Sequence, residues 1–294
     1  MNKLVKALAL DGNVRIYCIN IKDLVEKARL AHDLWPTSLA TLGRVAGITS
    51  IMAAMQKNDE DKIIAQINGG GPIGTVMVEA KANGDVRGFV GDNEIYLKYN
   101  DTNKLAVGSA VGINGYLKVT KDIGLKETFT GQVELQSGEI GDDFAYYFMV
   151  SEQTPSVVSC GVLVDTDESC KSAGALLIQL MPNAREEDIV RVEEVVKKLK
   201  PISTMLDEQE DPKEIILDLF NDAEILEVKQ FDWKCSCNKD RFKAALTTIN
   251  MSDLQEILEE DQRIEVKCEY CNTKYEFNEE EIKTIMDFKQ ACGK

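Results

Sequence analysis

Four cysteines near the end of the chain form two close pairs, and they constrain the fold more than any other feature. Cys235 and Cys237 are separated by one residue, Cys268 and Cys271 by two, and 30 residues lie between the pairs. Zinc prefers four ligands at tetrahedral corners, and paired spacings of this kind allow two short segments to supply them. In an extended strand, residues i and i+2 point to the same side. The sequence therefore predicts one zinc ion per chain, held by these four residues as thiolates.

The same four residues also allow redox chemistry. A metal-bound sulfur is a thiolate, which is the form that oxidants attack. A purely structural zinc site resists oxidation, so the spacing fits both a structural site and a redox switch. The other cysteines have no metal-binding spacing, and we interpret them as buried apolar residues or incidental surface thiols without a defined role. They are Cys18, Cys160, Cys170 and Cys292.

Length and charge narrow the classes of protein that the chain can belong to. Its 294 residues are enough for one large domain or two smaller ones. The chain lacks a run of about eighteen uncharged apolar residues, so we expect no membrane span. The apolar run at 7–10 is too short for a secretory signal, which predicts a cytoplasmic protein.

The negative charge is concentrated in the second part of the chain. The net charge is −16, and residues 183–294 account for −11 of it. Because nucleic-acid binders usually present a basic face, this charge argues against nucleic-acid binding by the cysteine-containing segment.

Residues 1–182 are expected to form a mixed α and β domain rich in hairpins. The first two strands are joined by Asp11-Gly12-Asn13, a hairpin turn signal. The helix at 38–56 is apolar nearly all round, so it belongs inside a domain, against a sheet. The expected strands are 3–10, 14–21, 62–68, 74–80, 86–90, 105–120, 126–136, 157–164 and 173–181, and the other helices are 23–34 and 139–150.

Two features that are often functional are interpreted as structural. Residues 69–74 match the pattern GxGxxG, but a strand follows instead of the helix that a phosphate site needs, and Pro72 removes a donor. We therefore expect no nucleotide binding. His32 is the single histidine, and no acid partner pattern accompanies it. We therefore assign no catalytic residue and expect no enzyme activity.

Residues 183–230 are expected to form a helical linker. The helix predicted at 186–200 carries an apolar stripe, and Asp211-Pro212 gives the next helix a capping residue followed by proline. Short amphipathic helices are weak folding units by themselves, so they must dock on another surface. The apolar residues are Ile189, Val192, Val196 and Leu199 in the first helix and Ile215, Ile216, Leu219 and Phe220 in the second.

Residues 231–294 are expected to form a small zinc-binding domain. We predict helices at 238–250 and 252–260, a hairpin with strands at 263–267 and 275–277, and a final helix capped by Asn278. About sixty residues bury little surface, whereas a structural zinc site contributes about 10–16 kcal/mol. We therefore expect this domain to unfold without its metal.

The two cysteine pairs resemble those of the redox-regulated heat-shock chaperone family, heat shock protein 33. The resemblance includes the gap between the pairs and their position C-terminal to a mixed α and β domain. The similar stretches are 231–237, 263–277 and 161–183, and the last contains Gly174-Ala175-Leu176-Leu177-Ile178-Gln179. The resemblance covers nearly the whole chain. It implies an α+β protein in three parts, namely a sheet domain, a helical linker wrapped on it and a zinc-containing switch.

The resemblance also implies a function. Such proteins are inactive when reduced and zinc-bound. Under oxidants and unfolding stress they form disulfides, release zinc, loosen the linker and hold unfolding client proteins without ATP. Of the three pairings of four cysteines we favour Cys235–Cys237 and Cys268–Cys271, since neighbouring thiols meet most often. The expected partners are client proteins, with no nucleic acid, nucleotide or membrane, and a homodimer of the oxidised protein is a possible assembly. The candidate client-binding residues are Ile189, Val196, Ile215, Leu219 and Phe220.

Two alternatives stay open at the level of sequence. A zinc-ribbon nucleic-acid-binding protein needs a basic face near the metal, and Lys234, Lys239, Arg241 and Lys243 form a small one among many acidic residues. An enzyme with a structural zinc tail needs a catalytic constellation in residues 1–182, and the sequence there contains no recognisable one.

Overall fold

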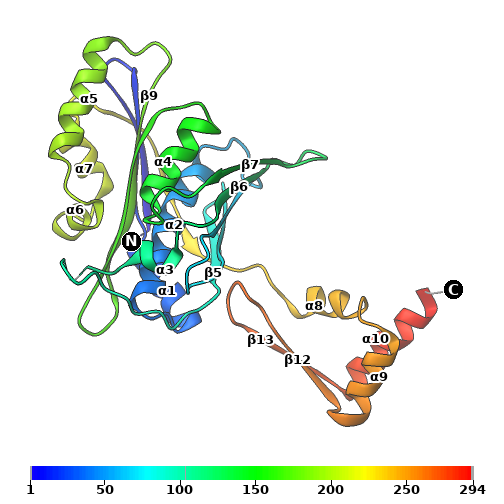
Figure 1. Cartoon of the computed structure of the whole chain (residues 1–294). Coiled ribbons are helices and arrows are strands. Elements are labelled where there is room, and N and C mark those ends of the chain that lie inside the picture. Colours follow the sequence, from blue (N-terminus) through cyan, green and yellow to red (C-terminus); the bar gives the residue numbers. More distant parts are fainter. Residues whose placement is uncertain (1, 103, 293–294) are drawn as a thin grey trace. The chain divides into compact units, whose positions relative to one another are not determined.

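The structure is a computed structural model that describes residues 2–102 and 104–292, without the side chains of residues 291 and 292. The side chain of Cys292 therefore lies outside the described residues. The chain forms two compact units, residues 1–234 and 235–294. Both contain helices and strands (Figure 1), so the predicted α+β class is confirmed. Within the described residues, no helix combines the length and the apolar character that a membrane span requires.

The described part of the first unit contains a five-stranded antiparallel sheet in the order β10-β1-β2-β9-β8. Alternate residues of a strand point to opposite faces, and here both faces are apolar. Ile16 and Cys18 of β2 belong to one buried cluster, whereas Tyr17 and Ile19 belong to another. The sheet thus needs a cover on each side. Its strands are β1 (Lys3–Ala9), β2 (Val14–Asn20), β8 (Ser156–Val164), β9 (Cys170–Leu180) and β10 (Glu224–Gln230).

One face is covered by helix α2 (Pro36–Ala54), which also packs against a second sheet in the order β11-β5-β4-β3-β6-β7. The helix is buried on nearly all sides, as its apolar sequence predicts. Gly47 lets it approach β9, because a Cβ atom there would lie 3.0 Å from Cβ of Ala175. The strands of the second sheet are β3 (Lys62–Asn68), β4 (Val76–Lys81), β5 (Asp85–Val90), β6 (Tyr116–Asp122), β7 (Phe129–Glu134) and β11 (Asp232–Trp233), and the other helices here are α1 (Lys22–His32), α3 (Val107–Val111) and α4 (Gly141–Val150).

The stretch interpreted as a linker covers the other face of the five-stranded sheet (Figure 1). It folds as helices α5 (Glu186–Lys198), α6 (Ile202–Glu208) and α7 (Pro212–Leu219). Helix α6 was not predicted, nor was strand β10, which follows α7 and pairs with β1. Residues 183–230 therefore supply a covering layer and also an edge strand of the sheet that they cover.

The prediction of the apolar stripe on α5 is wrong at one position. Val195 is buried, whereas Val196 is 36% exposed. Valine stands at both positions, so the sequence allows two phases of the helix. The observed phase buries Asp188, whose Oδ2 accepts a hydrogen bond from Asn13 Nδ2 at 3.0 Å. Of the other proposed client-binding residues, two are buried and two are half-buried. The buried ones are Ile215 and Phe220, and the half-buried ones are Ile189 and Leu219.

Carboxylates of the linker accept hydrogen bonds from the sheet around this apolar contact. Lys3 Nζ lies 2.8 Å from Asp211 Oδ1. Burial pushes the pKa of the Asp211 carboxyl up, but the hydrogen bonds from Lys3 and from the backbone N–H of Lys213 outweigh it and hold the pKa below its usual value. Two further contacts of this kind join Lys171 to Asp207 and the backbone N–H of Leu10 to Asp222.

We expect the substitution Asp211→Ala to loosen α7 by about 1–2 kcal/mol. Asp211 caps the helix through Lys213 N–H at 2.9 Å, and loss of such a cap costs about 0.5–2 kcal/mol. The pair with Lys3 is partly exposed and adds little. Hydrogen exchange of the α7 amides should accelerate roughly tenfold in Asp211→Ala and stay unchanged in the exposed control Asp218→Asn. Because the pKa is lowered, the contribution is complete above the unfolded value of 3.8 and is lost as the pH falls below it. Equal exchange in both variants at pH 7 would contradict the assigned cap.

The backbone of the glycine-rich segment at 69–74 packs closely against the backbone at the end of α3. A Cβ atom at Gly69 would lie 2.3 Å from the carbonyl oxygen of Gly112, just after α3. Strand β4 follows the segment, as predicted, in place of the helix of a phosphate site. The neighbouring prediction of strand structure over 105–120 is wrong in its first half, because α3 occupies it and β6 begins only at Tyr116.

Residues 231–233, which directly follow the linker, are fixed in the core of the first unit. Strand β11 pairs in parallel with β5, and Phe231, just before it, is 2% exposed. The Trp233 ring meets His32 edge to face, with 5.9 Å between the ring centroids. His32 is itself buried, in agreement with the structural role expected for it.

The second unit has the helices and the hairpin that the sequence predicts. Asn238 accepts a hydrogen bond from Arg241 N–H at 2.9 Å, and Asn278 accepts one from Glu281 N–H at 3.0 Å, so both act as helix caps. In its described part, the buried apolar cluster consists of Leu246, Leu254, Phe277, Ile282 and Ile285. The elements are α8 (Lys239–Leu246), α9 (Met251–Glu260), β12 (Arg263–Lys267), β13 (Lys274–Asn278) and α10 (Glu279–Cys292).

Candidate metal centre

The second cysteine pair lies in the turn between β12 and β13, as its spacing predicts. The turn is closed by Cys268 N–H, which donates to the Thr273 carbonyl at 3.0 Å, and by Asn272 N–H, which donates to the Cys268 carbonyl at 2.8 Å. Asn272 has φ +57°, a left-handed conformation that asparagine adopts more readily than most residues. The backbone of the turn thereby holds Cys268 and Cys271 in fixed positions.

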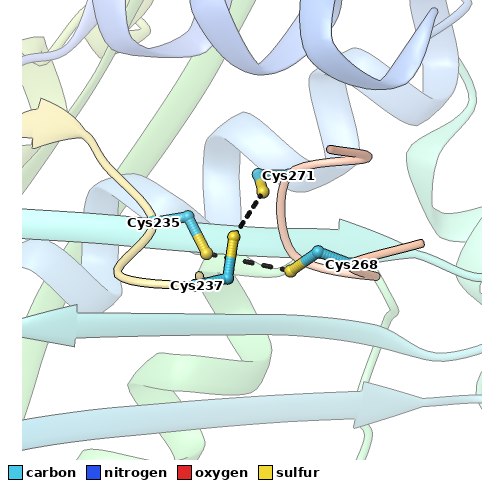
Figure 2. Close-up of side chains that lie close together, drawn as sticks. All are labelled: Cys235, Cys237, Cys268 and Cys271. Atoms are coloured by element: carbon cyan, nitrogen blue, oxygen red, sulfur yellow. Dashed lines mark hydrogen bonds between the residues drawn. The ribbon is translucent and has the colours of Figure 1, made fainter. Parts of the chain in front are cut away.

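The four predicted cysteines come together (Figure 2). Cys235 Sγ lies 3.8 Å from Cys268 Sγ, and Cys237 Sγ lies 3.3 Å from Cys271 Sγ. All four sulfurs lie within 4.8 Å of one another. Zn–S bonds of about 2.3 Å at tetrahedral angles place sulfurs about 3.8 Å apart. The donor set and its spacing therefore fit one zinc ion with small adjustments.

Two hydroxyl groups of the hairpin also contact the cluster, and the sequence analysis missed both. Tyr275 Oη lies 3.1 Å from Cys237 Sγ, and Thr273 Oγ1 lies 3.2 Å from Cys271 Sγ. The alternation of residues along β13 could have indicated the contact made by Tyr275. Tyr275 shares a strand face with the buried Phe277, so its ring turns inward beside the thiol-bearing turn.

The electrostatic surroundings of the four sulfurs are unequal. Burial raises the pKa of Cys268 to about 12. Burial also acts upward on Cys271, but hydrogen bonds, led by those from the hydroxyl and backbone N–H of Thr273, outweigh it and lower the pKa to about 7. The hydrogen bond to Cys237 is the main reason why the pKa of Tyr275 rises to about 12. The phenol therefore keeps its proton at neutral pH and can donate a hydrogen bond to the sulfur.

The other described cysteines are not part of this cluster. Cys18 and Cys170 are buried, and Cys160 is half-buried. Burial raises the pKa of Cys18 above its ordinary range and raises that of Cys160 and Cys170 to about 12. Because the thiolate is the reactive form, these three thiols are poor nucleophiles near neutral pH.

Comparisons with known proteins agree with the fold and the cysteine cluster. The chain matches the family model described as Hsp33 protein over residues 2–278. It is 43% identical over 288 residues to the 33 kDa chaperonin of Bacillus subtilis (strain 168), covering 98% of this chain and 99% of that protein. It is 42% identical over 288 residues, with the same coverage, to the 33 kDa chaperonin of Bacillus velezensis. The crystal structure of the 33 kDa chaperonin (heat shock protein 33 homolog) from Thermotoga maritima superposes with a TM-score of 0.92 at 33% identity, covering 99% of both chains. The resemblance found in the sequence is confirmed, and the chain belongs to the Hsp33 family.

Proposed function

We propose that this protein is a redox-regulated holdase chaperone that works without ATP in the cytoplasm. The observation that carries the proposal is the convergence of four cysteine sulfurs within 4.8 Å, in a unit whose described apolar core is small. The relatives named chaperonin support the chaperone part of the proposal. The redox part is supported by the close approach of these four sulfurs, which the described cysteines of the first unit do not share.

In the reduced state Cys235, Cys237, Cys268 and Cys271 hold one zinc ion as thiolates. The ion supplies positive charge that keeps four thiolates together and so joins the two segments that carry them. The turn between β12 and β13 fixes one pair of sulfurs, and the segment after β11 brings the other.

Oxidation ends this arrangement. Two thiolates give two electrons to one hydrogen peroxide molecule, whose O–O bond breaks, and with two protons the products are one disulfide and two waters. We propose the pairs Cys235–Cys237 and Cys268–Cys271. Disulfides prefer Cα separations of about 4.4–6.8 Å, and an extended i, i+2 pair lies near or beyond that limit. Closing the first pair therefore needs a bent backbone, so oxidation and local unfolding favour each other.

Loss of the thiolates removes the ligands, and the second unit then loses the free energy of metal binding. We propose that the linker helices loosen as a consequence and that unfolding client proteins bind the apolar residues so released. Ile215 and Phe220 are the strongest candidates, because they are buried between the linker and the sheet. Val196 is a weaker candidate than the sequence predicts, since it is already exposed. A homodimer of the oxidised protein fits the same proposal.

The nucleic-acid-binding alternative gains little support. Two lysines of the small basic group identified from the sequence form ion pairs. Lys234 pairs with Asp85 at 3.2 Å, and Lys239 pairs with Glu281 at 2.6 Å. These ion pairs reduce the positive charge available for phosphate. Tight binding of labelled RNA or DNA at physiological salt would favour this alternative.

The direct test compares reduced and peroxide-oxidised protein side by side. We expect the oxidised, mildly heated protein to release its zinc, to bind a hydrophobic dye and to suppress aggregation of a denatured model enzyme, all without ATP. The reduced protein should do none of these. If the oxidised, zinc-free protein keeps its compact fold and its reduced-state activity, the site is a structural zinc site and the proposed switch is wrong.

A further inference from the structure

Two side-chain hydroxyls approach sulfurs of the metal centre. Tyr275 Oη lies 3.1 Å from Cys237 Sγ, and Thr273 Oγ1 lies 3.2 Å from Cys271 Sγ. These two sulfurs are themselves 3.3 Å apart. One hairpin therefore provides two of the sulfurs and also the hydroxyl groups that contact the centre.

The fold restricts the two residues by different means. The ring of Tyr275 is half-buried and packs on the ring of Phe242 in α8, with 4.9 Å between their centroids. Its strand position opposite Val266 fixes the direction of the side chain. Thr273 is fixed through its carbonyl, which closes the turn by accepting from Cys268 N–H. Tyr275 is therefore held by ring packing, whereas the exposed side chain of Thr273 is held only through the backbone of the turn.

Hydroxyl donors of this kind change the chemistry of a thiolate. In the structure the Cys271 thiol donates to Thr273 Oγ1. When the sulfurs carry negative charge they can only accept, so Tyr275 and Thr273 must then donate. Hydrogen bonds to an ionised acceptor are stronger than neutral ones, and they reduce the repulsion among four thiolates. They also stabilise the electron pair with which a thiolate attacks a peroxide. Partners that support metal ligands in this way commonly contribute 10–100-fold to metal affinity.

We propose that Tyr275 and Thr273 are positioning residues that retain zinc at Cys237 and Cys271 and slow the reaction of these thiolates with peroxides. They thereby set the amount of oxidant that the switch requires. The part of this inference that concerns zinc retention is independent of the proposed redox function. The part that concerns the reaction with peroxides rests on that function. The reaction concerned is the two-electron oxidation of two thiolates by one hydrogen peroxide molecule, which yields one disulfide and, with two protons, two waters.

The first test uses reduced protein and no oxidant. Tyr275→Phe removes the hydroxyl and keeps the ring against Phe242. We expect zinc affinity, measured by competition with a chelator, to fall by about 10–100-fold. With Co²⁺ in place of zinc, the sulfur-to-metal charge-transfer bands should move, because the electron density on Cys237 changes. Tyr116→Phe is the control, since its hydroxyl contacts Gln66 at 3.3 Å in the first unit. It should leave both readouts unchanged.

Thr273 allows a matched pair of variants. Thr273→Val removes the hydroxyl at similar volume, whereas Thr273→Ser keeps it and should restore wild-type behaviour. We expect Thr273→Val to weaken zinc binding and Thr273→Ser to leave it intact. Unchanged zinc affinity and unchanged cobalt spectra in both Tyr275→Phe and Thr273→Val would overturn the inference.

The second test adds peroxide and follows zinc release with a metal-sensitive dye. Tyr275→Phe and Thr273→Val should release zinc at lower peroxide concentrations than wild type. If they weaken zinc binding but respond to peroxide as wild type does, the protective half of the inference is wrong. If peroxide releases no zinc even from wild type, the proposed switch fails instead, and the affinity measurements still decide the role of the two hydroxyls.

Discussion

Removing the metal from the reduced protein is expected to unfold residues 235–294 and to leave the first unit folded. In the described part of the second unit the apolar cluster contains five buried side chains, whereas a structural zinc site contributes about 10–16 kcal/mol. That contribution is comparable to the whole stability of a typical domain, which is about 5–15 kcal/mol. The first unit has its own large cores on both faces of the five-stranded sheet.

This expectation can be checked by adding a chelator and mapping proteolysis. Cleavage sites should appear within residues 235–294 and be absent from α2 and the two sheets. The substitution Cys268→Ser should give the same pattern without a chelator, since one ligand is lost. Cys160→Ala is a suitable control because Cys160 is not part of the cluster. A protease-resistant second unit in the zinc-free protein would mean that its apolar core is sufficient by itself.

The substitution Phe220→Ala is expected to release the linker without any oxidation. Phe220 is fully buried in the cluster between α5–α7 and the five-stranded sheet. Truncating a buried phenylalanine costs about 3–5 kcal/mol, because apolar contacts are lost and a cavity remains. The reduced, zinc-loaded variant should therefore bind a hydrophobic dye and suppress aggregation of a denatured protein. Amide exchange should rise in α5–α7 and stay slow in α2.

A control variant separates this effect from a general loss of stability. Val196→Ala lies on the same linker but alters a side chain that is already 36% exposed, so dye binding and chaperone activity should stay at the reduced wild-type level. If Phe220→Ala shows fast linker exchange without aggregation suppression, linker release alone does not activate the protein. The apolar residues under the linker are then not the client-binding surface.

Much of the fold could be predicted because the sequence contains local signals with a physical cause. The alternating residues of β12, the capping residue Asp211 and the all-round apolar α2 were identified correctly. Strand β10 was missed. Its exposed residues include Leu226 and Val228, on either side of Glu227, and only its pairing with β1 makes it a strand. Pairing between segments so far apart in the chain leaves no local pattern.

The cysteine cluster was predicted more fully than its surroundings. Cysteine spacing reports ligand geometry directly, because two residues of one short segment must reach the same ion. The hydroxyls of Thr273 and Tyr275 carry no such spacing rule, and their contacts depend on the turn conformation at Asn272 and on the ring packing at Phe242. The phase of α5 was missed for a similar reason, since the contact between Asn13 and Asp188 fixes it.

The order of strands in the five-stranded sheet has a consequence for synthesis of the protein. Strands β1 and β2 leave the ribosome well before their neighbours β9 and β10, because most of the other strands and helices lie between them in the sequence. Until then the nascent hairpin has apolar residues on both faces and an open edge, which makes it prone to aggregation. Such distant pairings also slow folding. A translating ribosome therefore carries, for most of the elongation time, a segment that itself needs protection from misfolding.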